Sequence, residues 1–156
     1  MTPSRARVPA AKSRPLSRDD LGFLLAKATQ RWNDLLHAQF RAHGYADVRP
    51  SYGSVLIPLF EQDGLRMGEL ARRARLSKQT MTTMVRLLER DRLVERRPDP
   101  VDRRATIVVL SRRARAFRPV AQRALAEVDA QAREVLDDAA VRQLKAALRL
   151  LATVGD

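Results

Sequence analysis

Residues 68–110 constrain the fold of this chain more than any other segment, because they combine two helical patterns with a hairpin pattern: GELARRARLSKQTMTTMVRLLERDRLVERRPDPVDRRATIVVL. Apolar residues first recur at helical spacing in two stretches separated by a tight turn. Two runs that suit β-strands, 93–97 and 105–110, then flank a connection with two prolines and two arginines. Helix, turn, helix and hairpin in this order predict a winged helix-turn-helix over residues 65–110.

The second of these helices has an apolar stripe and a polar face. Met81, Met84, Val85 and Leu88 form the stripe, and Ser77 is the expected N-cap. Short hydroxyl and amide side chains stabilise an exposed helix poorly, but they suit contacts to base edges and phosphates. An ordinary solvated face is the alternative, although such a face more often carries Glu and Lys. The residues expected to contact DNA are Ser77, Lys78, Gln79, Thr80, Thr82, Thr83 and Arg86.

The connection between the two strands is expected to project as a wing. Its two prolines restrict the backbone of the loop. Arg103 and Arg104 at the tip suit a narrow minor groove, where negative potential is concentrated. Asp102 is expected to hold one of these arginines by a charged hydrogen bond, and Arg97 completes the predicted DNA contacts. A plain surface hairpin is the alternative.

Composition narrows the classes of partner and excludes several chemistries. The 30 Lys and Arg residues against 18 Asp and Glu give a net charge of +12, which favours nucleic acid or an anionic membrane surface. The chain has no cysteine and only two histidines, so no metal site, cofactor or catalytic residue is predicted. It lacks a nucleophile elbow, which argues against an enzyme. No apolar run is long enough for a membrane span or a signal peptide, so a cytoplasmic location is expected.

The chain divides into four segments around the helix-turn-helix. Residues 1–17 are rich in Pro, Ala, Ser and basic residues and are expected to form a flexible tail. Residues 18–64 predict a helix that starts after Ser17 or at Asp19 and a second helix capped by Ser51, with a kink at Pro58. Residues 111–156 predict two helices, the first bent or delayed by Pro119 and the second capped by Asp137. The expected fold is mainly α (α+β winged helix-turn-helix), with about six helices and a two- to three-stranded β wing.

The helices at the two ends carry more apolar surface than the central lobe can cover. Burial against a second copy is the simplest solution, so a homodimer formed by the N- and C-terminal helices is expected. An intramolecular helical bundle is the alternative. The first helix is too sparse in Lys and Arg for a basic membrane-surface helix, and no membrane partner is expected.

The segment GELARRARLSKQTMTTMVRLLERDRLVERR, followed by DPVDRRA, resembles the MarR (multiple antibiotic resistance regulator) family of bacterial transcription factors, and the resemblance extends over about residues 18–153. It implies an obligate homodimer that binds a pseudo-palindromic operator, often as a repressor that small aromatic or phenolic anions release. By position it implies that residues 78–90 are the recognition helix, that Arg103 and Arg104 are the wing arginines and that Asp102 is the buttressing aspartate.

The resemblance also implies an effector pocket where the dimerisation helices meet the DNA-binding lobe. The residues expected there are Trp32, Leu36, Tyr52, Leu56 and Phe117, for each of which a plain core role is the alternative. Two positions depart from the family, because Arg75 and Arg92 stand in turns where glycine is common. If those turns are left-handed, each arginine costs roughly 1 kcal/mol relative to glycine.

The sequence therefore predicts a sequence-specific regulator that binds double-stranded DNA and responds to a small molecule. A non-sequence-specific architectural DNA-binding protein is the alternative that the charge also supports. Competition with random duplex separates the two, because equal displacement would favour the architectural protein.

Overall fold

The computed structural model describes residues 15–154, so most of the predicted N-terminal tail lies outside the described residues. The described chain forms six α-helices, one 3-10 helix and three strands. In chain order these are α1 (Leu21–Ala42), η1 (Pro50–Tyr52), α2 (Gly53–Glu61), β1 (Leu65–Arg66), α3 (Met67–Ala74), α4 (Lys78–Arg90), β2 (Val94–Pro98), β3 (Thr106–Leu110), α5 (Arg112–Arg133) and α6 (Asp138–Leu151). The expected fold class is confirmed. None of the helices in this part of the chain has the length and apolar character that spanning a membrane requires.

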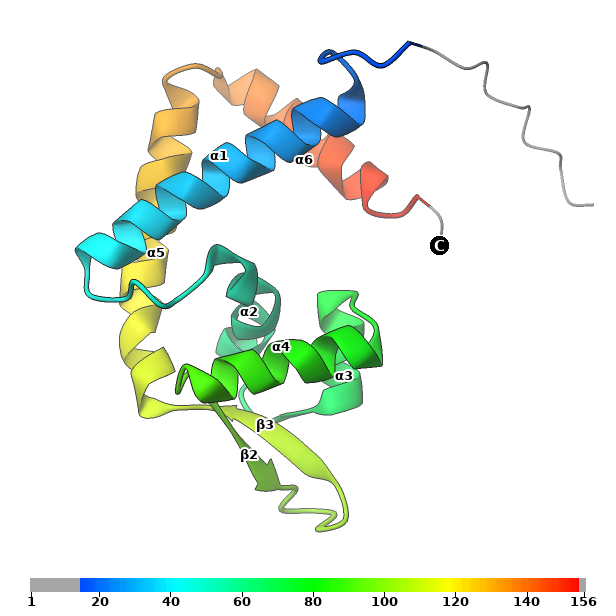
Figure 1. The fold of residues 1–156 in the computed structure, drawn as a ribbon, viewed down its shortest axis with the longest axis vertical. Helices are drawn as coiled ribbons and strands as arrows, with labels where there is room; N and C mark the ends of the chain where they lie inside the picture. The colour runs from blue at the N-terminus through cyan, green and yellow to red at the C-terminus, as the bar shows by residue number, and fades with distance from the viewer. Residues whose placement is uncertain (1–14, 155–156) are drawn as a thin grey trace, which may run out of the picture.

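The elements form a lower lobe and an upper group of helices, which are called the arms (Figure 1). The lobe contains α2, α3, α4 and an antiparallel sheet of strand order β1-β3-β2. In this sheet Leu65 pairs with Val108, and Val94 pairs with Leu110. The arms consist of α1, the upper half of α5 and α6 (Figure 1). The β2–β3 hairpin extends below the lobe as the predicted wing.

The core of the lobe follows the helical stripe that the sequence predicts. Met81, Val85 and Leu88 are fully buried on α4, whereas Met84 is only partly buried. Each buried side chain of this size contributes roughly 1.5–3 kcal/mol by leaving water. This stripe fixes which face of α4 points into the lobe, and it leaves the polar face outside.

Two of the predicted helix caps are confirmed. The Ser77 hydroxyl accepts the Thr80 backbone N–H at 3.1 Å, and the Asp137 carboxylate accepts the Ala140 backbone N–H at 2.7 Å. Each satisfies a backbone donor that the first turn of a helix leaves unpaired. A cap of this kind contributes about 1 kcal/mol.

Two predicted helix starts are wrong. Ser51 does not cap α2, because Pro50 begins a 3-10 turn and Tyr52 is the residue that precedes α2. The first helix begins at Leu21 because the preceding residues form a separate turn. In that turn Ser17 donates its backbone N–H to the Asp20 carboxylate at 3.0 Å.

The turns before and after α4 are left-handed at Arg75 and Arg92, which is the condition for backbone strain at these arginines. Arg75 has φ 52° and Arg92 has φ 58°, and they are the non-glycine residues with positive φ among residues 15–154. The strain is therefore present at both positions.

Helix α5 joins the lobe to the arms as one continuous element of 22 residues. Ser111 caps its start at Arg112, so Pro119 lies inside the helix and does not delay it. Phe117 is buried near the lobe, and Val128 is buried farther along, toward the arms. The part of α5 in the arms is thus continuous with the part that packs on the lobe.

Candidate nucleic-acid interface and pocket

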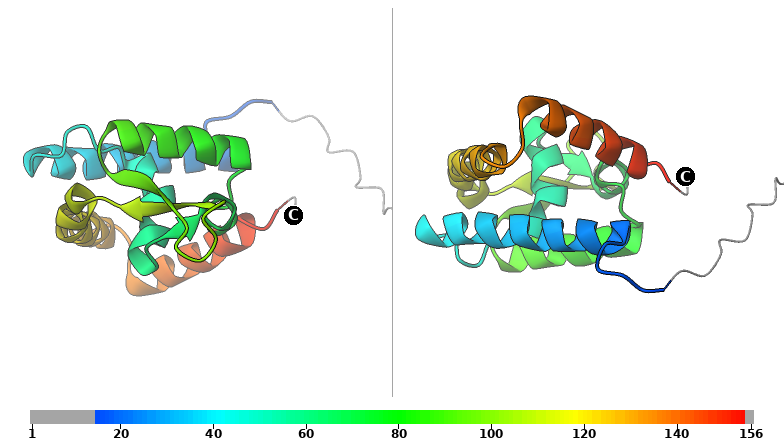
Figure 2. Two further views of the ribbon diagram at one scale, coloured as in Figure 1. Left: turned by 90° about the horizontal axis from the view of Figure 1, so that it is seen from below. Right: turned by 90° about the horizontal axis from the view of Figure 1, so that it is seen from above.

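Helix α4 and the β2–β3 hairpin both belong to the lower lobe, where the hairpin extends beyond α4 (Figure 1; Figure 2, left). The exposed residues on the polar face of α4 and its cap are Ser77, Lys78, Gln79, Thr80, Thr83 and Arg86, while Thr82 is partly buried. The structure therefore gathers the predicted helix residues on one face. The wing residues Arg97, Asp102, Arg103 and Arg104 are also exposed.

Three of the four hydroxyl groups of this face, those of Ser77, Thr82 and Thr83, already donate their protons within the protein. Thr82 donates to the Lys78 carbonyl at 2.8 Å, and Thr83 donates to the Gln79 carbonyl at 3.2 Å. Ser77 likewise donates to the Thr80 hydroxyl at 2.8 Å. A hydroxyl that gives its proton to the backbone presents its oxygen lone pairs outward. In this arrangement the threonines offer acceptors, which match the amino groups of cytosine and adenine in a major groove.

A buried aspartate holds the wing in place, but it is not the one predicted. The carboxylate of Asp99, which is only 7% exposed, accepts the backbone N–H groups of Val101 at 2.8 Å and Asp102 at 3.3 Å. Its second oxygen accepts Nε of Arg66 on β1 at 2.6 Å. These hydrogen bonds, first those of the Val101 backbone and the Arg66 side chain, hold the pKa of Asp99 below its usual value. Asp99 is therefore the charged link between the wing and the rest of the sheet.

The Asp102 carboxylate holds Arg104 by a charged hydrogen bond, but through the backbone and not through the guanidinium. The carboxylate accepts the backbone N–H of Arg104 at 3.1 Å and forms no ion pair with either wing arginine within residues 15–154. An aspartate bonding the backbone two residues on is a local turn preference. Arg97 pairs instead with Glu95 at 2.7 Å, because residues two apart on a strand share a face.

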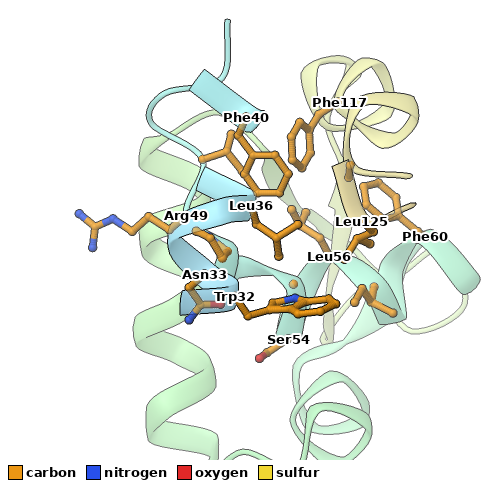
Figure 3. Close-up of a pocket in the computed structure, with 15 residues that line it drawn as sticks. Trp32, Asn33, Leu36, Phe40, Arg49, Ser54, Leu56, Phe60, Phe117 and Leu125 are labelled. Atoms are coloured by element: carbon orange, nitrogen blue, oxygen red, sulfur yellow. The ribbon is translucent and has the colours of Figure 1, made fainter. Parts of the chain in front are cut away.

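A pocket of about 290 Å³ lies between α1, the start of α2 and α5 (Figure 3). Four of the five predicted residues line it: Trp32, Leu36, Leu56 and Phe117. Two further aromatic rings, Phe40 and Phe60, complete the wall, and the Phe40 and Phe117 rings meet edge to face at 4.9 Å. The pocket is thus an aromatic and aliphatic cavity between the arms and the lobe.

The sequence does not predict the polar groups of this pocket. Asn33, Arg49 and Ser54 line it, and Figure 3 shows the Arg49 guanidinium pointing outward from the cavity. Asn33 lies three residues before the predicted Leu36, so helical spacing places both on one face of α1. Arg49 and Ser54 come from a loop and from a short helix, where no periodicity marks them.

Tyr52, the fifth predicted residue, does not line the pocket. Its side chain is 1% exposed, and its hydroxyl donates to the Asp91 carboxylate at 2.5 Å. Burial, and then this hydrogen bond, raise the pKa of Tyr52. The Arg113 guanidinium donates to the Asp91 backbone carbonyl and to the Asp47 carboxylate. Tyr52 thus belongs to a polar network at the C-terminal end of α4.

A second cavity of about 330 Å³ lies between α1, the end of α5 and α6. Its lining is almost entirely apolar and includes Leu25, Leu136, Leu144 and Leu148. Trp32 lines both this cavity and the pocket. The two spaces are therefore separated in part by a single indole ring.

The helix-turn-helix and its attached hairpin define a winged-helix fold. Residues 50–106 match the model of the MarR family. No match was found among curated proteins.

Solved structures of transcription regulators share the fold over nearly the whole chain. A probable transcriptional regulator from Pseudomonas aeruginosa is 28% identical with a TM-score of 0.73, covering 85% of this chain and 97% of its own. CouR from Rhodococcus jostii RHA1, bound to p-coumaroyl-CoA, is 26% identical with a TM-score of 0.69, covering 88% and 95%. A structure of the repressor CouR on a 23-mer DNA duplex aligns at 24% identity with a TM-score of 0.68, covering 92% and 100%.

Proposed function

We propose that this protein is a sequence-specific regulator that binds double-stranded DNA as a homodimer. The observation that carries the proposal is the exposed face of α4, where acceptor hydroxyls and an amide lie between cations beside a projecting wing. Such a helix fits a major groove, and an arginine-tipped hairpin fits the adjoining minor groove. The similarity to CouR, a repressor bound to DNA, supports this reading and favours repression.

Base recognition, rather than architectural binding, is favoured by the neutral groups on α4. Cations alone suffice to bind phosphates, and they supply no sequence preference. Gln79 and Thr83, in contrast, carry groups that pair with base edges. As a DNA-binding regulator the protein is proposed to act in the cytoplasm, and no catalytic role is proposed for it.

The substitution Arg86→Ala tests direct contact between α4 and DNA. Arg86 is exposed in the middle of this face, and a bidentate contact from arginine to guanine contributes about 1–3 kcal/mol. The proposed homodimer loses two such contacts, so we expect operator affinity to fall about 30-fold or more, while affinity for random duplex falls less. The operator is first located by footprinting on the DNA that flanks the protein's own gene, and both affinities are then measured by gel shift.

Arg123→Ala is the matched control, because Arg123 is an exposed arginine on α5, outside both α4 and the β2–β3 hairpin. Unchanged operator binding by the Arg86→Ala variant would contradict the role of this residue. If random duplex displaces the operator as well as the operator displaces itself, the architectural alternative is favoured instead.

The homodimer is proposed because the arms expose an apolar surface around the second cavity. Leu24, Leu144 and Leu148 are each more than two-fifths exposed on α1 and α6. A second copy covers such a surface by symmetry and places two α4 helices on one face of the DNA. Half-sites one helical turn apart, about 34–36 Å, then give a pseudo-palindromic operator.

A small aromatic anion is proposed as the effector. The pocket supplies aromatic rings for a flat ligand, and Arg49 at its edge is proposed to turn its guanidinium inward to meet the negative charge of the ligand. CouR, a structural neighbour, is bound to p-coumaroyl-CoA in its own structure. A ligand here releases DNA only insofar as it prefers an arm geometry that does not bind DNA.

Trp32 allows this ligand site to be tested directly, because it is the only tryptophan in the chain. We expect p-coumarate or p-coumaroyl-CoA to quench Trp32 fluorescence and to raise the thermal midpoint, since binding to the native state stabilises it. Ala121→Phe, which fills the pocket from α5, is expected to abolish the quenching, whereas Ala121→Ser leaves it intact. Equal quenching in both variants would place the ligand elsewhere.

A further inference from the structure

The cations of the lobe divide into two groups according to whether a carboxylate neutralises them. Six form ion pairs at 2.6–2.9 Å: Arg66 with Asp99, Arg72 and Arg73 with Glu69, Arg90 with Asp91, Arg96 with Glu89 and Arg97 with Glu95. The other six have no carboxylate partner among residues 15–154: Arg75, Lys78, Arg86, Arg92, Arg103 and Arg104. The net positive charge of the lobe therefore resides on a defined set of side chains.

Four members of this unpaired set are the cations already assigned to DNA from the helix face and the wing tip. The two others, Arg75 and Arg92, lie in the turns at opposite ends of α4 (Figure 1). Charge pairing is an independent criterion, because it uses no helical spacing. It selects four of the five cations expected to contact DNA, leaves out Arg97, which pairs with Glu95, and adds these two.

Both additional arginines occupy strained backbone positions. The other positive-φ residues that the structure describes are glycines, Gly44 and Gly64. A left-handed non-glycine residue costs roughly 1–2 kcal/mol, and strain of this kind is concentrated at functional sites. At both positions glycine would avoid this strain, but the chain has a long cationic side chain instead.

We propose that Arg75 and Arg92 bind the phosphate backbones on the two sides of the groove that α4 occupies. This inference rests on the proposed DNA binding. Helix α4 has 13 residues and is about 20 Å long, whereas a major groove is about 12 Å wide. When the helix axis crosses the groove at an angle, its two ends lie beside the flanking sugar-phosphate chains.

The hydrogen bonds of Arg75 and Arg92 are compatible with this role. Arg92 is exposed, and no side-chain partner of it is found among the described residues. The guanidinium of Arg75 donates to the Ala152 carbonyl beyond α6 at 2.7 Å. A charged phosphate is a stronger acceptor than a neutral carbonyl, so Arg75 exchanges one partner for the other when DNA binds.

The test compares Arg92→Gly and Arg75→Asn with the wild type on a random 30-base-pair duplex and on the footprinted operator. Glycine and asparagine tolerate the left-handed backbone but carry no charge. In a dimer each substitution removes two phosphate contacts, so the slope of log K against log salt is expected to become shallower by about 1.8. Affinity is expected to fall about tenfold, and by the same factor for both duplexes. Arg123→Gln removes one charge from α5 and serves as the control.

The stability of the Arg92→Gly variant supplies a second, opposite readout. Relief of the left-handed strain is expected to raise its urea midpoint while its DNA affinity falls. A raised midpoint with unchanged affinity and slope would overturn the proposal, because Arg92 would then be strained without binding DNA. A loss confined to the operator, with no change in slope, would also overturn it by indicating a base contact. Failure of the wild type to bind either duplex refutes the proposed function instead.

Discussion

Replacing both wing arginines, Arg103→Ala with Arg104→Ala, is expected to lower operator affinity about a hundredfold and to flatten its salt dependence. A dimer loses four cations, and each phosphate contact contributes about 0.9 to the salt slope. Neither arginine has a carboxylate partner within the described chain, so their charge is free to act on DNA. The loop that presents them is fixed by Asp99, so little entropy is lost when they bind.

Fluorescence anisotropy with the operator at several salt concentrations measures this effect. Arg97→Ala is the matched control, because the Arg97 guanidinium is already paired with Glu95 on the same strand. Its effect is expected to be several-fold smaller than that of the double substitution. A loss of less than about threefold for the double variant would show that the wing is not a main contact with DNA.

The substitution Leu144→Glu is expected to convert the proposed homodimer into a monomer. Leu144 is 46% exposed in the isolated chain and lines the apolar cavity between α1 and α6. A carboxylate buried in that interface without a partner costs several kcal/mol. A monomer reads only half of a pseudo-palindromic operator, so operator affinity is expected to fall about a thousandfold or more.

Light scattering at micromolar concentration gives the mass of each variant. Gln143→Glu adds the same charge at the neighbouring exposed position of α6, outside the cavity lining, and is expected to remain dimeric. A Leu144→Glu protein that keeps the mass of two chains would exclude this surface as the interface. Circular dichroism distinguishes loss of assembly from loss of folding.

The features that the sequence predicted well depend on neighbours close along the chain. The buried stripe of Met81, Val85 and Leu88 follows from helical spacing alone. The caps at Ser77 and Asp137 each involve a backbone group three residues away. The family resemblance added the expected effector pocket, which no local pattern indicates.

The features that it missed depend on partners distant in the sequence. Tyr52 bonds Asp91, 39 residues away, and Asp99 bonds Arg66, 33 residues away. Nothing in the spacing of either aspartate indicates its partner. The family resemblance alone implies that Tyr52 lines the pocket and that Asp102 is the buttressing aspartate of the wing. Arg49 enters the pocket lining for the same reason, since the fold brings its loop against α1.

The continuity of α5 makes it a lever between the arms and the DNA-binding face. At 22 residues it is about 33 Å long, so a tilt of about 6° displaces one end by about 3.4 Å, the rise of one base pair. Pro119 removes the backbone hydrogen bond to the Arg115 carbonyl, in the turn of this helix that carries the buried Phe117. Helix α5 bends at the lowest energy cost near Pro119. A small change in the angle of the arms then displaces the DNA-binding lobe by about the rise of one base pair.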